Sequence, residues 1–595
     1  MNYPIWEGPT GGLLIACVAI VHVFVSHFAV GGGLFLVLTE RKARREGDER
    51  LLAYVRRFSR FFVLLSLVLG AITGVGIWFT IGLVNPQATA SLITTFVWVW
   101  AIEWTFFAVE IAAAMVYYYG WDRLTVEAHL AVGWIYFWTA WLSLVAINGI
   151  LAFMLTPGAW TTTRNVWDGW LNPTFMPSVL LRTCGAVGLA GIYALLVAAW
   201  SRDPELKAKL ARYAGLFWVL PMAIAMPLLL SWYFRAAEWG GVQVREVLGT
   251  SQDGVLALTR SVLAGSASGQ PITQRAAFIT VVASLVTVLL VLAAATIRRR
   301  RFGRPLAAAI MAAGFVVVGG AEWTREGLRK PYVIGHFMFV NGVRLPAPPH
   351  APGPPPDFVA SFGQDRFTVD EVTRAGVLRT ANWVRMPQPA GEAAGPPGTA
   401  RGDGIGRQSA RGAEVFRLLC TACHTIDGYN AIRPLARGKS AAAIGAIIDR
   451  LARPVDEAGK PAAWHDPKLK LTSWRGRHMP PFVGSADERQ ALAVHLALLG
   501  GASPSSVAEG AAVAADVGAK HFLEVCAACH GSNAAWPMAP RVGGHSARYF
   551  YDLLGRLPAV NEIMPRFEGT DEERQAVAAY IVTLSQPGSG KEGVR

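Results

Sequence analysis

The sequence predicts an all-α protein, in which a polytopic transmembrane helix bundle of about eight spans precedes two small helical domains. Three observations predict this class. The 595 residues are 53% hydrophobic, have a mean hydropathy of +0.34 and include 21 Trp. Eight apolar stretches are each long enough to cross a bilayer, which takes about 20 residues. Two copies of the haem-attachment pattern CxxCH then occur in the polar C-terminal part.

The apolar stretches give the positions of the expected helices. They lie at about 12–39, 59–84, 93–118, 129–154, 177–200, 212–235, 274–297 and 305–322. Residues 1–10 contain no Lys or Arg and the first stretch is full length, so we expect no cleavable signal peptide.

The formal net charge of +14 is concentrated in the loops between spans, which argues against nucleic-acid binding. Eight Lys and Arg lie between Arg41 and Arg60, and further clusters follow the fifth and seventh spans. The positive-inside rule places these loops in the cytoplasm. We therefore expect a multi-pass protein of the bacterial inner membrane, with its N-terminus and C-terminal domains in the periplasm.

The composition changes near Leu345, where Pro, Gly and Ala become frequent. Such a segment favours an extended linker. The expected division is a membrane domain at 1–344, a linker at 345–400, one soluble domain at 401–502, and a second with its tail at 503–595. Each soluble domain has a CxxCH near its start, a Met-Pro further on and a closing amphipathic helix, which indicates an internal duplication.

The two CxxCH motifs predict two covalent haem c groups. Paired thiols three residues apart bind the haem vinyl groups, and the adjacent imidazole binds the iron. A thioredoxin-type dithiol or half of a zinc site would not explain both copies. The other cysteines, Cys17 and Cys184, lie in apolar helices and imply no disulfide framework. The motif residues are Cys420, Cys423 and His424 in the first domain, and Cys526, Cys529 and His530 in the second.

The sixth iron ligand is expected from the later Met-Pro loops, at Met479 and Met564. This arrangement resembles class I cytochrome c folds, in which the methionine thioether completes the coordination. His and Met ligation suits electron transfer rather than oxygen chemistry. Core packing is the alternative role for each methionine, and His478 is a rival ligand in the first domain.

Ionisable residues inside the membrane domain indicate a functional site, because a charge within a bilayer is costly. His22 and His27 lie in the first span, and Glu103 and Glu110 share one face of the third, two helical turns apart. The carboxylates suggest a proton relay, or a metal ligand with its proton donor. The alternatives are a histidine bonded between helices and a pair of polar packing contacts.

A second polar group, GGAEWTREGLRKPYVIG, is expected to follow the eighth span. Glu322 and Glu326 are four residues apart and so share a face. Arg325 and Arg329 can neutralise them or bind haem propionates. A surface salt-bridge cluster is the alternative.

These segments resemble subunit I of the cytochrome bd oxidases, over roughly residues 1–340. The first span, VHVFVSHFAVGGGLFLVLTE, is similar to the family's first helix. The third, AIEWTFFAVEIAAAMVYYYGWDRL, is similar to its AIE…E…FGWDRL segment, and EGLRKPYVIG to its EYGRQPWAIG.

The resemblance implies roles for five residues. His22 would be the axial ligand of the oxygen-reactive haem, and Glu103 the carboxylate beside that haem. Glu110 would belong to the proton path from the cytoplasm. Glu326 would be the axial ligand of the high-spin haem b, and Arg329 its neighbouring charge.

Other positions depart from the family. Arg182 stands where the family has a histidine for its low-spin haem b, and Ala277 where it has a methionine. Arginine stays protonated and is no ordinary iron ligand. The quinol-binding loop shortens to residues 237–274, and the family's ninth span is missing. The low-spin haem and the quinol site are therefore expected to be altered. His27 is an addition, as either a further ligand or a proton carrier.

The functional hypothesis is a terminal oxidase that passes electrons from two periplasmic haems c to two non-covalent membrane haems, where O2 is reduced. The membrane haems would be b-type, with a d-type haem as the alternative for one. Quinol oxidation with electrons flowing outward, and a non-catalytic electron-transfer subunit, are the alternatives. Expected partners are a second bd-type subunit, small single-span subunits and a cytochrome c or quinol donor, with NO as an alternative substrate.

Overall fold

The structure is a computed structural model. It describes residues 12–249, 260, 271–297, 302–346, 366–382, 384–385, 403–449, 451, 453–455, 462–464, 470–472, 479–504, 517–531, 537–542, 545–560, 564 and 566–584. Most of the expected linker, the basic residues Arg298 to Arg301, and His478 lie outside this part. The described residues form two compact units, one ending at Gly342 and the other beginning at Val343.

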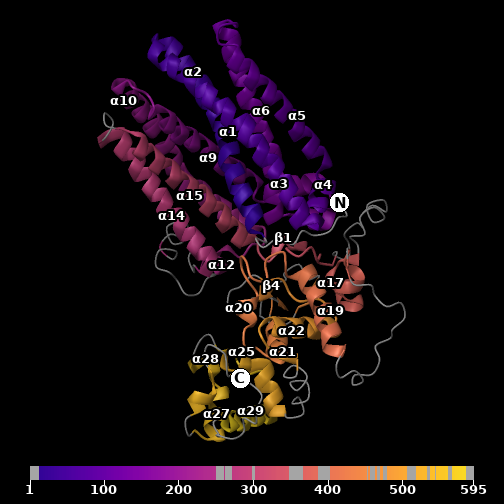
Figure 1. The fold of residues 1–595 in the computed structure, drawn as a ribbon. Helices are drawn as coiled ribbons and strands as arrows, with labels where there is room; N and C mark the ends of the chain where they lie inside the picture. Colours follow the sequence, from indigo (N-terminus) through magenta and orange to yellow (C-terminus); the bar gives the residue numbers. More distant parts are fainter. Residues whose placement is uncertain are drawn as a thin grey trace. The chain divides into compact units, whose positions relative to one another are not determined.

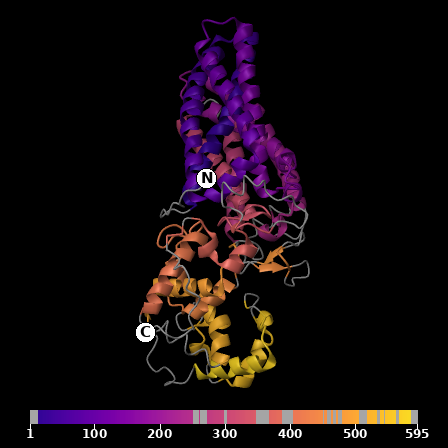
Figure 2. The same ribbon diagram turned by 90° about the vertical axis from the view of Figure 1, so that its right-hand side faces the viewer.

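The first unit contains eight helical segments long and apolar enough to span a membrane, as the sequence predicted. They run alongside one another as a bundle (Figures 1 and 2). The spans are α1 (Leu13–Glu46); α2 (Glu49–Val63) continued by η1 (Leu64–Leu69) and α3 (Gly70–Val84); α5 (Val97–Tyr119); α6 (Val126–Leu155); α9 (Phe175–Ala198); α10 (Pro204–Tyr213) continued by η2 (Ala214–Val219) and α11 (Leu220–Trp239); α14 (Pro271–Leu292) with η3 (Ala293–Ile297); and α15 (Arg304–Arg329).

Shorter elements connect these spans. A two-stranded antiparallel hairpin follows the last of them, with Tyr332 opposite Phe339. The connecting elements are α4 (Pro86–Thr95), α7 (Trp160–Thr163), α8 (Val166–Trp170), α12 (Val244–Leu248), β1 (Tyr332–Ile334) and β2 (Met338–Phe339).

Two spans begin earlier than predicted, and the first and the last end later, the first at Glu46 rather than 39. The second begins at Glu49 rather than 59, because α2 is amphipathic: it buries Leu51, Tyr54, Val55 and Phe58 and leaves its arginines outside. The sixth begins at Pro204 rather than 212, because α10 buries Leu210 and Ala211 and leaves Arg212 exposed. The eighth continues to Arg329 rather than 322, so the polar group lies on the helix and does not follow it. Salt bridges among these side chains offset their charges there.

The turn between the first two spans is formed by Gly47 and Asp48. Gly47 adopts φ 63°, a left-handed conformation that ends α1. The Asp48 carboxylate accepts a hydrogen bond from the Leu51 amide and so caps α2. A hydrogen bond from the Lys209 ammonium, 2.7 Å away, lowers the pKa of Asp48. This contact joins the two basic loops at the end of the bundle expected in the cytoplasm.

Three consecutive glycines let α1 pack closely against three different neighbours. A Cβ atom on Gly31 would lie 1.9 Å from the Ala186 carbonyl oxygen of α9. On Gly32 it would meet the Phe62 ring of α2 at 2.8 Å, and on Gly33 the Tyr136 ring of α6 at 2.4 Å. None of these positions has room for a side chain, so the triplet fixes the position of α1 at the centre of the bundle.

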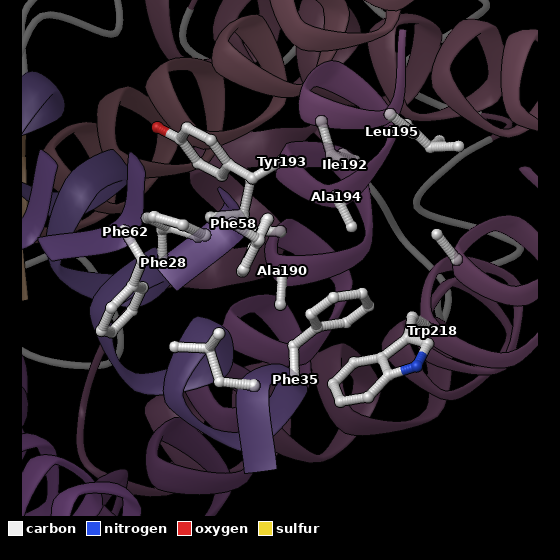
Figure 3. Close-up of a cluster of buried hydrophobic side chains, with 14 of the residues drawn as sticks. Phe28, Phe35, Phe58, Phe62, Ala190, Ile192, Tyr193, Ala194, Leu195 and Trp218 are labelled. Carbon is white, nitrogen blue, oxygen red and sulfur yellow. The ribbon is translucent and has the colours of Figure 1, made fainter. Parts of the chain in front are cut away.

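Aromatic side chains fill the space between α1 and its neighbouring helices (Figure 3). Phe28 stacks on Tyr193 of α9, with ring centroids 4.0 Å apart. Phe35 lies 4.9 Å from both Phe58 and Trp218, measured between ring centroids. Such offset and edge contacts add about 0.5–1.5 kcal/mol each to the energy of burial. They join α1, α2, α9 and η2 in one core.

The second unit is also mainly helical. Its elements are α17 (Val369–Ala375), α18 (Val377–Thr380), α19 (Asp403–Leu419), α20 (Arg433–Ala436), α21 (Ala441–Asp449), β3 (Arg453–Val455), β4 (Lys470–Thr472), α22 (Ala486–Leu499), α24 (Val517–His521), η7 (Phe522–Cys526), α25 (Ala527–His530), α26 (Ala539–Val542), α27 (Ala547–Leu554), α28 (Leu557–Val560) and α29 (Asp571–Thr583).

A buried carboxylate connects α18 to α22 in this unit. Glu488 is 3% exposed and accepts hydrogen bonds of 2.8 Å from the Val377 and Leu378 amides. It also completes a capping box with Ser485. One side chain therefore satisfies amides at the start of two helices.

Candidate functional site

His22 lies on α1 against α3. Its Nδ1 atom lies 3.0 Å from the Thr73 hydroxyl oxygen, and that hydroxyl donates to the Leu69 carbonyl at 2.7 Å. The hydroxyl oxygen is therefore the acceptor, and Nδ1 carries the proton. A proton on Nδ1 leaves the Nε2 lone pair for a metal, which is the arrangement that orients a histidine ligand. Gly74 leaves space for the ring, because a Cβ there would lie 3.2 Å from its Cε1 atom.

The carboxylates of α5 each have a partner on α6. The Ser143 hydroxyl donates to Glu103 at 3.0 Å, and the Tyr136 hydroxyl lies 2.9 Å from a Glu110 oxygen. Glu110 is buried, whereas Glu103 is half-buried. The structure thus orients both predicted carboxylates into the α5–α6 contact.

Arg182 stands where the related family has a haem-binding histidine, and here it forms an ion pair. Its guanidinium lies 3.2 Å from one Glu322 oxygen, and Arg325 lies 2.9 Å from the other. His27 is buried, donates to the Val23 carbonyl at 2.9 Å, and lies within electrostatic reach of Arg182 and Glu322. Ala277 is buried among apolar side chains. Four charged or titratable groups therefore gather between α1, α9 and α15.

Glu326 and Arg329 form the other ion pair on α15. The Arg329 guanidinium also donates to the Val333 carbonyl at 2.9 Å. Within the part of the chain that the structure describes, Arg329 Nε and Arg325 Nη1 are buried donors without a hydrogen-bond acceptor. An unused buried donor is costly, so both nitrogens are suited to bind a carboxylate.

A buried polar cluster at the opposite end of the bundle was missed by the sequence analysis. Glu40 is fully buried, and its carboxylate accepts hydrogen bonds from the Tyr117 hydroxyl at 2.6 Å and from Arg44 at 2.7 Å. His129 Nδ1 lies 3.0 Å from the same carboxylate. The signal in the sequence was the seven-residue spacing of Ser143, Tyr136 and His129 on α6, which matches that of Glu103, Glu110 and Tyr117 on α5.

The first CxxCH lies in a turn after α19. The Cys423 and His424 amides both donate to the Cys420 carbonyl, at 3.1 and 2.9 Å. His424 Nδ1 lies 3.0 Å from the Asn430 carbonyl oxygen and donates to it, which orients the ring. The second motif occupies η7 and α25.

The second unit has one part around each CxxCH motif, which we call the first and the second lobe. The two lobes repeat one helix crossing. A Cβ on Gly412 would lie 2.0 Å from the Ala491 carbonyl oxygen, and one on Gly518 would lie 2.2 Å from that of Ala576. Each glycine lies eight residues before the first Cys of its motif. Both closing helices begin with a capping box, at Ser485 and Thr570. This register supports the proposed internal duplication.

The two methionines also keep this register. Met479 lies six residues before Ser485, and Met564 six residues before Thr570. Both are partly buried, and their role as iron ligands stays a prediction.

Comparison with known proteins separates the two parts of the chain. Residues 13–249 match the family model described as cytochrome bd terminal oxidase subunit I. This match includes the segments that contain His22, Glu103 and Glu110. Residues 13–249 are therefore similar to subunit I of the cytochrome bd oxidases. Residues 513–581, in the second lobe, match the model for subunit III of cbb3-type cytochrome c oxidase.

Among solved structures, the bd oxidase of Geobacillus thermodenitrificans is similar at 15% sequence identity and a TM-score of 0.44. That similarity covers 54% of this chain and 87% of the other. No curated protein matches.

A bd-type subunit I domain is therefore fused to a cytochrome c domain in a haem-binding respiratory membrane protein. The residues fit haem in three respects: Nε2 of His22 is left for iron, the His424 ring is oriented through its Nδ1 atom, and the two α15 arginines have unused donors. Within the described residues, no three His, Cys, Asp or Glu side chains converge as a metal cluster would require. Haem needs only one or two axial ligands.

Replacing Gly412 with valine is expected to destabilise the lobe around the first CxxCH by at least about 3 kcal/mol, the upper end for overpacking, because the side chain would separate α19 from α22. If each CxxCH binds one haem c, as the sequence predicts, the chain-bound haem c measured as the pyridine haemochrome should fall from two groups to one. Gly518→Val should do the same in the second lobe. Gly406→Ala on α19 is the control, because its Cβ would meet nothing within 4 Å. Full retention of both haems in Gly412→Val would contradict the proposed crossing.

Proposed function

We propose that the protein is the catalytic subunit of a bd-like terminal oxidase that receives electrons through its haem c domains and reduces O2 in its membrane domain. The reaction consumes four electrons and four protons for each O2 and yields two water molecules. The observation that carries the proposal is the Arg182–Glu322 ion pair. It uses the side chain that replaces the family's low-spin haem ligand, in a chain that has gained haem c domains.

In this proposal two haems c are covalently attached. Two further haems are bound non-covalently in the membrane domain: one is b-type, and the other is either b-type or d-type. Haem iron, when bound, supplies one-electron redox chemistry. His22 and Glu326 would each offer one axial ligand. Arg325 and Arg329 would bind propionates through their unused donors. Cys420 and Cys423, with Cys526 and Cys529, would form the thioethers.

The carboxylates of α5 would supply protons. Glu110 would accept a proton from the cytoplasmic side and pass it towards Glu103. The Ser143 hydroxyl holds the Glu103 carboxylate in place at 3.0 Å. A buried carboxylate that gains and loses a proton avoids a permanent charge in the bilayer.

The proposed environment is the bacterial inner membrane, with the haem c domains in the periplasm. A second bd-type subunit and small single-span subunits would complete the enzyme. Large apolar side chains on α3, α5 and α11 are exposed in the isolated chain, including Phe79, Trp98, Trp104 and Leu228. Such surfaces suit lipid or partner helices.

Steady-state oxygen uptake by the purified enzyme tests the proposal. Reduced cytochrome c should support rapid uptake, and quinol should support less than about a tenth of that rate, because Arg182, which stands where the family has its low-spin haem histidine, is paired with Glu322 and cannot bind iron. Rapid uptake with quinol alone would overturn the electron route. Reduction of cytochrome c by quinol without oxygen uptake would instead establish the outward-flowing alternative, and consumption of NO in place of O2 would change the substrate.

A further inference from the structure

Helices α5 and α6 carry polar side chains at the same seven-residue interval. Seven residues make two turns, about 10 Å, so each set lies along one face. The helices run antiparallel and side by side (Figure 1). The sets therefore meet in three pairs, which we call the α5–α6 ladder: Glu103 with Ser143, Glu110 with Tyr136, and Tyr117 with His129.

The middle pair stays hydrogen-bonded whether or not Glu110 carries a proton. The Tyr136 hydroxyl lies 2.9 Å from Glu110 and 3.1 Å from the Ala29 carbonyl oxygen on α1. Its single proton can be donated to one of them at a time. When Glu110 is ionised, Tyr136 donates to the carboxylate. When Glu110 is protonated, the carboxyl donates to the phenol oxygen, and Tyr136 turns to Ala29. No buried group is left unpaired in either state.

The third pair connects the ladder to the end of the bundle expected in the cytoplasm. The His129 and Tyr117 rings stack with centroids 4.2 Å apart, and both side chains hydrogen-bond to Glu40. Arg44 also contacts Glu40 and is 24% exposed. The cluster therefore reaches from a side chain in contact with solvent to the fully buried Glu40 carboxylate.

Two glycines fix the positions of the phenol rings. A Cβ on Gly33 would lie 2.4 Å from the Tyr136 ring, and one on Gly133 would lie 3.1 Å from the Tyr117 ring. Larger side chains at either position would push the hydroxyls away from their carboxylates. The close packing thus holds the hydroxyl groups of Tyr136 and Tyr117 within hydrogen-bonding distance of Glu110 and Glu40.

We propose that Tyr136 and the cluster of Glu40, His129 and Tyr117 deliver protons from the cytoplasmic end of the bundle to Glu110, and so extend the carboxylate path along the α5–α6 ladder. Protons would enter at the Glu40–His129–Tyr117 cluster and pass through Tyr136 to Glu110 and Glu103. The proposal rests on the proposed function, and it adds Tyr136 and the entry cluster as the residues that deliver protons to Glu110. Successive pairs are about 10 Å apart, a distance that a chain of about three hydrogen-bonded water molecules would span at ~2.8 Å per bond.

Tyr136→Phe is the main test, because it removes one hydroxyl and keeps the ring. The purified enzyme with its partner subunits is reconstituted into vesicles, reduced, and mixed with O2. A pH-indicator dye reports proton uptake from the cytoplasmic side. Uptake should slow at least tenfold, since a positioned proton donor contributes about 10²–10⁴-fold. Haem content and the rate of haem c reduction should match those of the unmodified enzyme.

Two further variants make the test specific. Glu40→Gln keeps the shape of the entry cluster and removes its titrating group, so proton uptake should slow to a similar extent. Tyr54→Phe is the matched control. It removes another buried hydroxyl, which donates to Ala194 at 2.8 Å outside the ladder, and uptake should be unchanged.

The outcomes separate the ladder from the oxidase proposal. If the unmodified enzyme takes up protons and both Tyr136→Phe and Glu40→Gln do so at the same rate, the ladder is wrong and the oxidase function stands. Proton uptake from the opposite side during oxygen consumption would also overturn the ladder. An unmodified enzyme that consumes no oxygen with cytochrome c would overturn the proposed function itself.

Discussion

Oxygen uptake should fall at least 100-fold when His22 is replaced by alanine, while both haem c groups stay attached. The substitution removes the imidazole whose Nδ1 is held by Thr73, and with it the Nε2 lone pair available to iron. In this variant the proposed membrane haem has lost its axial ligand. The CO-difference spectrum of the membrane haem should therefore be lost, and the pyridine haemochrome should report unchanged haem c.

Thr73→Val distinguishes ligand loss from general disruption. Valine has nearly the shape of threonine but cannot accept the Nδ1 proton, so His22 would keep its position with a less fixed ring. Outer contacts of this kind typically change metal affinity or activity by about 10–100-fold, and we expect a decrease near tenfold. Normal CO binding and oxygen uptake in His22→Ala would refute the assignment of this histidine.

The second large effect is expected on stability. Replacing Glu322 with alanine should destabilise the membrane domain by about 3 kcal/mol, the lower end for breaking a buried ion pair. Glu322 lies between Arg182 and Arg325 at 3.2 and 2.9 Å, and the exposed fractions of these side chains are only 12–21%. Its removal leaves two guanidinium groups near one another without their shared counter-charge.

Unfolding of the detergent-solubilised protein, followed by circular dichroism, measures this change. Glu238→Ala is the control, because Glu238 pairs with Arg245 at 2.9 Å, and Arg245 is 53% exposed. Such a surface pair contributes at most about 1 kcal/mol. If Glu322→Ala and Glu238→Ala had the same free energy of unfolding, the ion pairs of Glu322 with Arg182 and Arg325 would not stabilise the membrane domain as predicted.

The sequence predicted the membrane fold well and its charged segments less well. Hydropathy located all eight spans, but it placed the start of the second at 59 and the end of the eighth at 322. Both errors occurred at charged residues. In α2 the arginines lie on the face opposite Leu51 and Phe58, and in α15 the charges are neutralised by ion pairs within the helix. Hydropathy averaged along the sequence counts each charged residue as polar and takes no account of the salt bridges that neutralise it.

The candidate site was predicted residue by residue but not as an arrangement. His22, Glu103 and Glu110 were visible because ionisable groups are rare in apolar helices. Tyr136 was not, since a tyrosine in a membrane helix is unremarkable until the residue opposite is known. Arg182 was seen as a missing ligand, whereas the structure gives it Glu322 as a partner 140 residues away.

The sequence by itself determined the eight spans and the two CxxCH motifs, because hydrophobic length and thiol spacing are properties of consecutive residues. Only the tertiary structure decided that Tyr136 meets Glu110, that Glu40 joins His129, and that Glu322 is shared by two arginines. Those pairings depend on which helices are neighbours and on how closely glycines such as Gly31 and Gly33 let them approach, and packing in three dimensions sets both.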